Sequence, residues 1–139
     1  MKTTRNLFVY GTLRRDPQHE LFRLLARHAR FLGDATVQGR LYDLGNYPGW
    51  VPSENGRVLG EVYAIDPSHW DLVIARLDEY EACTSSDPLP HEYRREVVPV
   101  TLSNGDSIAA WAYILNREPE RSREIRSGDY LSWRAKAGA

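Results

Sequence analysis

Residues 58–81 read VLGEVYAIDPSHWDLVIARLDEYE, and this stretch predicts a strand that runs directly into a helix. Over residues 58–65 the apolar side chains alternate between two faces, which is typical of a strand. Asp66, Pro67 and Ser68 follow and indicate a helix start, because a side-chain oxygen can cap free N–H groups and proline fits the first turn. We therefore expect one strand followed by one helix at the centre of the chain.

The predicted helix over residues 67–81 carries an acidic residue on its apolar face. With about 100° of rotation per residue, Glu81 falls into the same arc as the apolar side chains. These are Trp70, Val73, Ile74 and Leu77. Burial and the negative end of the helix dipole are expected to raise the pKa of Glu81, which suits a general base or acid near neutral pH. Alternatively, the helix ends before Glu81 and leaves it in water, or Glu81 pairs with an arginine.

Similar patterns predict the elements of the first half of the chain. The apolar run over residues 7–10 indicates a buried central strand, and residues 18–28 show helical spacing. A strand interrupted at Gly39 is expected over residues 36–44. Residues 46–57 are rich in proline, glycine and asparagine, so they are expected to form a surface loop.

Two β-rich runs in the second half, residues 93–102 and 107–115, bracket Asn104-Gly105, which is typical of a two-residue hairpin turn. Pro99 has no backbone N–H group to donate, so we expect it on a sheet edge or at a bulge. Strands and helices do not alternate regularly along the chain. The sequence therefore predicts an α+β fold, a small mixed β-barrel or curved sheet flanked by two main helices.

The composition is that of an ordinary globular chain and excludes several classes of protein. The length of 139 residues fits one domain over 1–139. Eighteen basic and 19 acidic residues give a net charge of −1, which disfavours general binding to nucleic acid or to an anionic membrane. A single cysteine, Cys83, excludes an internal disulfide and fits a reducing compartment. The N-terminal apolar run is too short for a signal peptide or membrane span, so we expect a cytoplasmic protein.

The sequence contains no phosphate-binding loop, nucleophile elbow, paired-histidine metal motif or dinucleotide fingerprint. Cys83 and His91 could form a nucleophilic pair, although the acidic residues just before Cys83 disfavour a thiolate. Tyr47 and Trp50 could either line a pocket or anchor their loop. These absences disfavour several large classes of enzyme.

A second candidate site is the turn Tyr10-Gly11-Thr12-Leu13 at the end of the first strand. Glycine allows a sharp turn there, and consecutive N–H groups can converge on a carboxylate or carbonyl oxygen. The alternative is that the segment is an ordinary turn without a ligand.

The chain resembles the γ-glutamylcyclotransferase-like family, also called AIG2-like, through a set of short motifs in the right order. The nearest branch is the small bacterial one akin to γ-glutamylamine cyclotransferases. The motifs are VYGTLR at residues 9–14, GEVY at 60–63, LDEYE at 77–81, YRR at 93–95 and IRSGDY at 125–130. They span nearly the whole chain.

The resemblance implies a mixed α+β fold around a small barrel, with a cavity between the first turn and the helix that ends at Glu81. It implies that Glu81 is the catalytic base and that Tyr10, Gly11, Thr12 and Leu13 hold the γ-glutamyl group. The reaction it implies is an intramolecular aminolysis that releases 5-oxoproline and an amine. The expected partner is a small γ-glutamyl substrate, with no metal or cofactor, and the expected oligomeric state is a monomer or weak homodimer.

Two departures from the family pattern affect what the resemblance implies. Residues 84–90 form an insertion after the proposed base, and Ala82 stands where relatives often have glycine. The insertion could reshape the leaving-group side of the pocket. Tyr93 and Tyr113 either supply hydroxyl groups to the pocket wall or pack in the core.

The alternatives to a cyclotransferase of γ-glutamyl amines or peptides are a non-catalytic metabolite-binding module and removal of a γ-glutamyl protecting group in biosynthesis.

Overall fold

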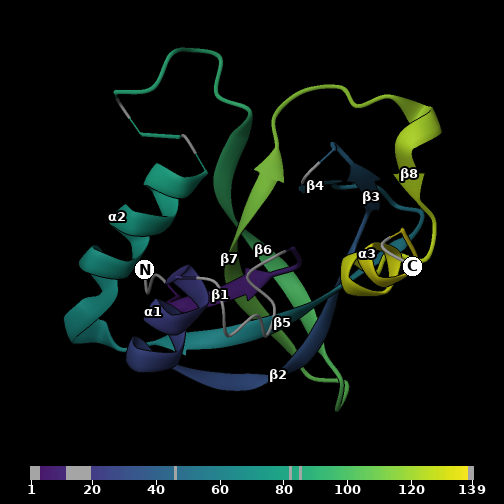
Figure 1. Cartoon of the computed structure of the whole chain (residues 1–139). Coiled ribbons are helices and arrows are strands. Elements are labelled where there is room, and N and C mark those ends of the chain that lie inside the picture. The colour runs from purple at the N-terminus through teal and green to yellow at the C-terminus, as the bar shows by residue number, and fades with distance from the viewer. Residues whose placement is uncertain (1–3, 12–19, 46, 82, 85, 138–139) are drawn as a thin grey trace.

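The computed structural model describes residues 4–11, 20–45, 47–81, 83–84 and 86–137 (Figure 1). Two of the predicted site residues, Thr12 and Leu13, lie outside this described part of the chain.

In the described residues, five strands close into a barrel in the order β1-β5-β2-β6-β7. They are β1 (Asn6–Val9), β2 (Ala29–Gln38), β5 (Arg57–Ile65), β6 (Tyr93–Leu102) and β7 (Ser107–Leu115). Neighbouring strands are antiparallel except β1 and β7, which run parallel. The first strand therefore lies centrally between β5 and β7 and is buried over its last three residues, as predicted.

A smaller sheet in the order β4-β3-β8 lies beside the barrel (Figure 1). It consists of β3 (Arg40–Asp43), β4 (Pro48–Val51) and β8 (Glu124–Ile125). Gly39 separates β2 from β3 and has φ of +149°, a backbone conformation that other residues rarely adopt. A side chain at this position would also run into the indole ring of Trp50. Glycine therefore allows the chain to leave the barrel at this point and enter the second sheet.

Helices α1 (Glu20–His28) and α2 (Trp70–Tyr80) lie on one side of the barrel, whereas α3 (Tyr130–Ala137) lies on the other (Figure 1). The short 3-10 helices η1 (Pro67–His69) and η2 (Arg121–Arg123) precede α2 and β8. The predicted helix start is confirmed, because the side chain of Asp66 accepts a hydrogen bond from the Ser68 backbone N–H at 3.2 Å.

Among the described residues, two clusters of buried apolar side chains hold these layers together. One joins the barrel strands to the small sheet and α3, and it includes Phe8, Tyr10, Val62, Trp50, Ile125 and Tyr130. The other lies between the barrel and helices α1 and α2, and it includes Leu7, Leu25, Tyr63, Leu77, Tyr93 and Tyr113. The second cluster sets the position of the α2 helix on the barrel, and with it the position of Glu81.

The predicted fold class is confirmed, and two local predictions are wrong. Residues 36–44 form parts of two strands in different sheets rather than one interrupted strand. Residues 46–57 are not only a loop, because they contain β4, in which Pro48, Gly49 and Trp50 are buried. A Cβ atom on Gly49 would lie 2.9 Å from the Leu44 side chain, so here tight packing overrides the turn preference of proline and glycine.

The hairpin between β6 and β7 also differs in detail from the prediction. β6 ends at Leu102 and β7 begins at Ser107, so the connection has four residues, Ser103 to Asp106, rather than two, and the Leu102 N–H donates to the carbonyl oxygen of Asp106 at 2.8 Å. Pro99 lies on the part of β6 that has no partner in β2, since β2 pairs with β6 only through Ala35 and Thr36. The prediction of an edge position for Pro99 is confirmed.

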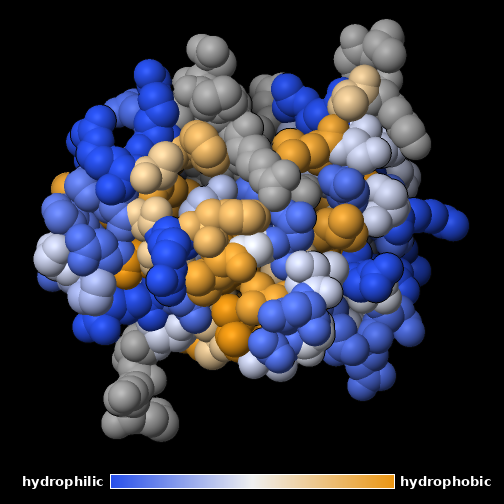
Figure 2. Space-filling view, turned by 90° about the horizontal axis from the view of Figure 1, so that it is seen from below, coloured by the Kyte–Doolittle hydropathy of each residue, from blue (hydrophilic) through white to orange (hydrophobic). Residues whose placement is uncertain are grey.

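Figure 2 shows the face beneath β2 and this hairpin, where apolar residues gather within a polar rim.

Gly128 offers a test of how the C-terminal segment docks on the barrel. Its carbonyl oxygen accepts a hydrogen bond from Leu59 of β5 at 2.8 Å, its φ is +71°, and an added Cβ would collide with the Arg57 carbonyl oxygen. We expect Gly128→Ala to lower the free energy of unfolding in urea by roughly 3 kcal/mol. Gly45→Ala, at φ of +112° in open space, should lose only the backbone term of about 1 kcal/mol. Equal losses in both variants would contradict this docking.

Candidate active site

Glu81 lies at the C-terminal end of α2, directly after its last residue. Its backbone N–H donates to the carbonyl oxygen of Leu77 at 2.9 Å, so the helical hydrogen bonding extends to Glu81 itself. Val73, Ile74 and Leu77 form the buried face of the helix, as the sequence predicts. The side chain of Glu81 continues this face and is half-buried.

The environment of Glu81 raises the pKa of its carboxyl group to about 7. The largest cause is burial, which removes water from the charged form, followed by the negative charges of Glu92 and Asp78. The sequence predicts that the pKa is raised and that burial contributes to this. It does not predict the two neighbouring carboxylates, which are Asp78, one helical turn earlier, and Glu92, the residue before β6.

Tyr10 follows β1 and points its buried hydroxyl group at β7, where it donates to the carbonyl oxygen of Tyr113 at 2.6 Å. Burial and then the charge of Glu81 raise the pKa of Tyr10, which places the two side chains in one electrostatic environment. Gly11 lies against β4, since a Cβ on it would be 3.0 Å from the Pro48 ring. The described half of the predicted turn, Tyr10 and Gly11, is therefore packed between β7 and β4.

The hydroxyl groups of Tyr93 and Tyr113 both have protein partners. Tyr93 donates to the carbonyl oxygen of Pro48 at 2.6 Å, and Tyr113 donates to the Asp78 carboxylate at 2.6 Å. The pKa of Tyr93 is raised by burial, then by Tyr10 and Glu81. These hydroxyl groups join β6 to β4 and β7 to α2.

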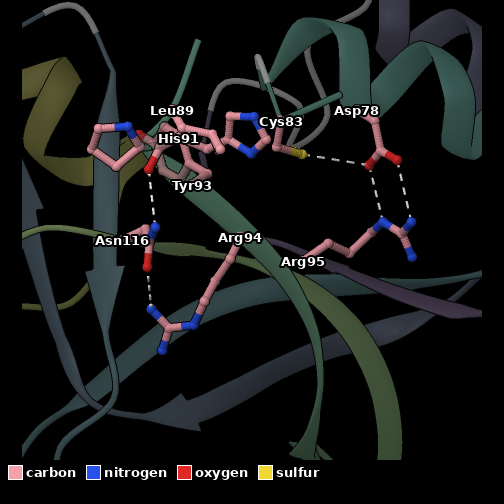
Figure 3. A pocket seen from close by; sticks show the side chains of 9 residues that line it. Asp78, Cys83, Leu89, His91, Tyr93, Arg94, Arg95 and Asn116 are labelled. Atoms are coloured by element: carbon pink, nitrogen blue, oxygen red, sulfur yellow. Dashed lines mark hydrogen bonds and ion pairs between the residues drawn. The ribbon is translucent and has the colours of Figure 1, made fainter. Parts of the chain in front are cut away.

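The Asp78 carboxylate fastens the last turn of α2 to the barrel. In addition to the Tyr113 hydroxyl, it accepts hydrogen bonds from two nitrogens of the Arg95 guanidinium, Nε at 2.9 Å and a terminal nitrogen at 3.2 Å (Figure 3). Arg95 in turn lies over the ring of Trp111, with 4.7 Å between the guanidinium carbon and the ring centre. A bidentate pair of this kind is directional, so it fixes where the helix end lies on β6 and β7.

Glu92 is a part of this region that the sequence did not reveal. Its carboxylate accepts a hydrogen bond from the Tyr47 hydroxyl at 2.8 Å and from Arg117 Nε at 3.0 Å. The ring of Tyr47 lies against that of Tyr93 with 6.3 Å between centres. The only signal in the sequence is its place directly before the YRR motif. Trp50, the other loop aromatic, is a core residue with 2% of its surface exposed.

The structure thus brings Glu81, Tyr10, Gly11 and Tyr93 to the end of the barrel where β1, β4, β6 and α2 meet. Tyr113 belongs to this region through its carbonyl oxygen, whereas its hydroxyl group faces Asp78. Burial is the largest cause of the raised pKa values of Tyr10 and Tyr93, and the hydrogen bond to Glu92 is the largest cause for Tyr47; the negative charge of Glu81 adds to each shift.

A cavity of about 700 Å³ lies beside this region, between the insertion after Glu81 and the start of β6 (Figure 3). Asp78, Cys83, Leu89, Pro90, His91, Tyr93, Arg94, Arg95 and Asn116 line it. Asn116 bridges the other two polar groups on its side of the cavity, the His91 carbonyl oxygen at 3.1 Å and Arg94 at 3.2 Å. Leu89 and Pro90 of the insertion form part of its wall, whereas Glu81, Tyr10 and Gly11 are not among the residues that line it.

Cys83 is not set up as a nucleophile. Burial, followed by the charge of Asp78, raises the pKa of its thiol to about 12, and the thiol donates to Asp78 at 3.7 Å. In the part of the chain that the structure describes, no three histidine, cysteine or acidic side chains form a group that could hold a metal ion. Among the described residues, no helix is long and apolar enough to cross a membrane.

Replacing Glu81 by glutamine should stabilise the protein in a pH-dependent way. The pKa is about 7 in the folded chain against an ordinary 4.5, so the folded state holds the proton more tightly and ionised Glu81 destabilises it as the pH rises. We expect the stability gain of Glu81→Gln in urea unfolding to grow by roughly 2 kcal/mol from about pH 4 to about pH 8. The exposed neighbour Glu79 provides the control, since Glu79→Gln should show no such growth. A gain independent of pH would contradict the buried environment of Glu81.

The thiol of Cys83 gives an independent probe of the same helix end. Because the folded environment raises its pKa to about 12, we expect its reaction with a disulfide reagent near pH 8 to be more than tenfold slower than in urea. Asp78→Asn removes the negative charge and should speed the reaction in the folded protein. The single cysteine makes the assignment unambiguous. Equal rates in folded and unfolded protein would show that the thiol is not held as described.

Comparison with known proteins gives a consistent result over nearly the whole chain. The family model described as gamma-glutamyl cyclotransferase, AIG2-like, matches residues 7–132. The gamma-glutamylcyclotransferase family protein YtfP of Escherichia coli K12 is 34% identical over 126 residues, which cover 90% of this chain and 95% of that protein. The gamma-L-glutamyl-butirosin B gamma-glutamyl cyclotransferase of Niallia circulans is 32% identical over 131 residues, covering 93% and 77%.

Solved structures agree with the sequence comparisons. The crystal structure of an AIG2-like protein from Mus musculus superposes with a TM-score of 0.71 at 26% identity and covers 93% of this chain and 89% of that one. The solution structure of YtfP from Escherichia coli superposes with a TM-score of 0.61 at 34% identity, covering 93% and 98%. The chain therefore belongs to the AIG2-like family of gamma-glutamyl cyclotransferases.

Proposed function

We propose that the protein releases 5-oxoproline and a free amine from a γ-glutamyl amine or small γ-glutamyl peptide, with Glu81 as general base and then general acid. The family relationship supports an enzyme of this general kind. The observation that carries the specific proposal is the carboxyl group of Glu81, half-buried beside Tyr10 with a pKa of about 7.

The reaction needs no nucleophile from the protein. The α-amine of the γ-glutamyl group attacks its own γ-carbonyl carbon, a C–N bond forms to close the five-membered ring, and the C–N bond to the leaving amine breaks. Because nucleophile and target belong to one molecule, the enzyme has mainly to hold the substrate in the folded conformer.

Proton transfer is the step for which Glu81 is suited. The α-amine is an ammonium ion near neutral pH, so a base must take its proton before or during attack. The α-nitrogen loses two protons as it becomes the lactam N–H. Glu81 takes one and, as the carboxylic acid, passes it to the nitrogen of the leaving amine as the C–N bond breaks, and the second proton goes to the released amine or to solvent, so Glu81 returns to its carboxylate form. A carboxyl group with a pKa of about 7 is present in both forms near neutral pH, which suits both transfers.

Substrate binding is proposed at the turn that begins with Tyr10 and Gly11 and continues to Thr12 and Leu13. Backbone N–H groups there could bind the α-carboxylate or the developing oxyanion. The hydroxyl groups of Tyr93 and Tyr113 are engaged by Pro48 and Asp78 and both rings lie in the core, which supports packing over a supply of free hydroxyl groups to the substrate, although Tyr93 also lines the cavity.

The leaving amine could be part of a larger molecule. The relative from Niallia circulans is named for a γ-glutamyl derivative of butirosin B, an example of such a substrate for that protein. Removal of a γ-glutamyl protecting group by this chain would use the same chemistry and differ only in the leaving group. The cavity lined by Leu89 and His91 has room for a leaving group of that kind.

Incubation of the purified protein with a panel of γ-glutamyl amines and γ-glutamyl dipeptides, followed by mass spectrometry of 5-oxoproline, tests the proposal. We expect release from at least one member, an acidic limb of kcat/KM near pH 7, and a loss of at least about 100-fold in Glu81→Gln. Glu79→Gln, an exposed change on the same helix, should retain activity. Full activity in Glu81→Gln would eliminate Glu81 as the base, and a panel left wholly intact would favour a binding module.

A further inference from the structure

The cavity between the insertion and β6 contains a buried nitrogen atom that makes no hydrogen bond. This atom is Nε2 of His91, and among the described residues no other buried side-chain nitrogen or oxygen lacks a partner. His91 lines the cavity together with Cys83 and Tyr93 (Figure 3). Because buried polar groups in folded proteins nearly always have a partner, a polar atom of a ligand is expected beside this nitrogen.

The charged groups that line the cavity favour an anionic ligand. Two guanidinium groups, those of Arg94 and Arg95, line it against one carboxylate, that of Asp78. This carboxylate already accepts hydrogen bonds from two Arg95 nitrogens and from the Tyr113 hydroxyl. The described lining therefore carries one more positive than negative charge, which a single anionic group of a ligand would balance.

Arg94 keeps donors for such a group, because a guanidinium carries five N–H bonds. Its Nε donates to Glu96 at 2.8 Å, and one terminal nitrogen donates to the Asn116 side-chain oxygen at 3.2 Å and to the Leu115 carbonyl oxygen at 3.5 Å. Among the described residues, the other terminal nitrogen has no hydrogen-bond partner. Arg94 can therefore bind an anion without giving up its present bonds.

The rest of the cavity wall is largely apolar. Leu89 and Pro90 come from the insertion, and Leu89 leaves 81% of its surface exposed. The Tyr93 hydroxyl is bound to Pro48, so this residue offers its ring to the cavity. A volume of about 700 Å³ lies in the range that small-molecule sites occupy. The lining thus fits a ligand with an apolar body and one anionic end.

We propose that this cavity is a binding site for a small organic carboxylate with an apolar body. Nε2 of His91, in the tautomer that carries a proton there, donates to a carboxylate oxygen, and Arg94 balances its charge. Leu89 and Tyr93 pack against the apolar body. The site is separate from the proposed γ-glutamyl site, and its existence does not depend on the proposed reaction.

The carboxylate has two possible sources with the same chemistry. One is a free carboxylate, and the other is the leaving half of a γ-glutamyl amino acid, a source that rests on the proposed function. Cys83 lines the cavity and follows Glu81 by two residues, so their Cα atoms are at most about 7.6 Å apart. The cavity therefore adjoins the end of α2, within reach of a leaving group.

NMR titration of the histidine rings with N-acetyl-L-leucine tests the proposal without turnover. Of the four histidines, His91 is assigned by the loss of its resonance in His91→Phe, and we expect a saturable shift of this resonance. N-acetyl-L-leucinamide has the same body without the charge and should bind at least about tenfold more weakly. His91→Phe should lose a similar factor. Absent binding, equal binding of acid and amide, or unchanged affinity in His91→Phe would overturn the proposal.

Arg94→Gln provides a second variant, which decides the matter even where His91→Phe does not fold. Its matched control is Arg40→Gln, because Arg40 and Arg94 are each 43% exposed and each pairs with a glutamate, whereas Arg40 does not line the cavity. We expect Arg94→Gln to weaken N-acetyl-L-leucine binding by at least about fivefold and Arg40→Gln by less than about twofold. Equal losses would show a general effect of net charge and would contradict the site.

Turnover of γ-glutamyl-L-leucine and γ-glutamyl-3-methylbutylamine distinguishes the two sources, because the second substrate is the first without its carboxylate. If the leaving half is the occupant, kcat/KM should favour the leucine substrate in the parent, and Arg94→Gln should lose this preference. If N-acetyl-L-leucine binds and neither substrate is preferred, the occupant is a free carboxylate. Binding without any turnover would leave the site standing and count against the proposed function. Turnover without binding of N-acetyl-L-leucine would leave the proposed function standing and overturn this inference.

Discussion

The site depends on the bond between Asp78 and the barrel. Arg95 grips both oxygens of this carboxylate while Tyr113 donates to one of them, so the last turn of α2 has one position on β6 and β7. Glu81 follows three residues later, so its position on the barrel is set by the same contacts. Packing of the apolar helix face alone would leave the end of the helix free to fray, since helix ends are the least constrained part of a helix. The hydrogen bonds of Asp78 to Arg95 and Tyr113 therefore fix the position of Glu81, which apolar packing alone would not do.

That placement sets a conflict between stability and chemistry. A carboxyl group in a half-buried position with two carboxylates nearby is unfavourable as an ion, and the fold retains it although glutamine would fit the same space. The same unfavourable environment brings the pKa of Glu81 to the range in which a proton can be both taken and returned. The absence of a usable thiolate at Cys83 fits a reaction whose nucleophile arrives with the substrate.

The sequence predicts those parts of the molecule that depend on local pattern. Helical periodicity places Glu81 on the buried face, because that face is set by residues one and two turns away. Local pattern fails to predict β4, because Pro48 and Gly49 pack closely against side chains distant in the sequence instead of forming a turn. It also fails for Glu92, since its partner Tyr47 lies 45 residues away and no periodic pattern links the two. Such pairings arise only when the barrel closes.

The most direct test of the account is a crystal structure of Glu81→Gln with an uncleaved γ-glutamyl amine bound. The account predicts that the α-amine nitrogen lies within hydrogen-bonding distance of the side chain at position 81, with the γ-glutamyl group held against the turn at Tyr10 and Gly11. An α-amine directed away from position 81, or a ligand bound only in the cavity beside His91, would contradict it.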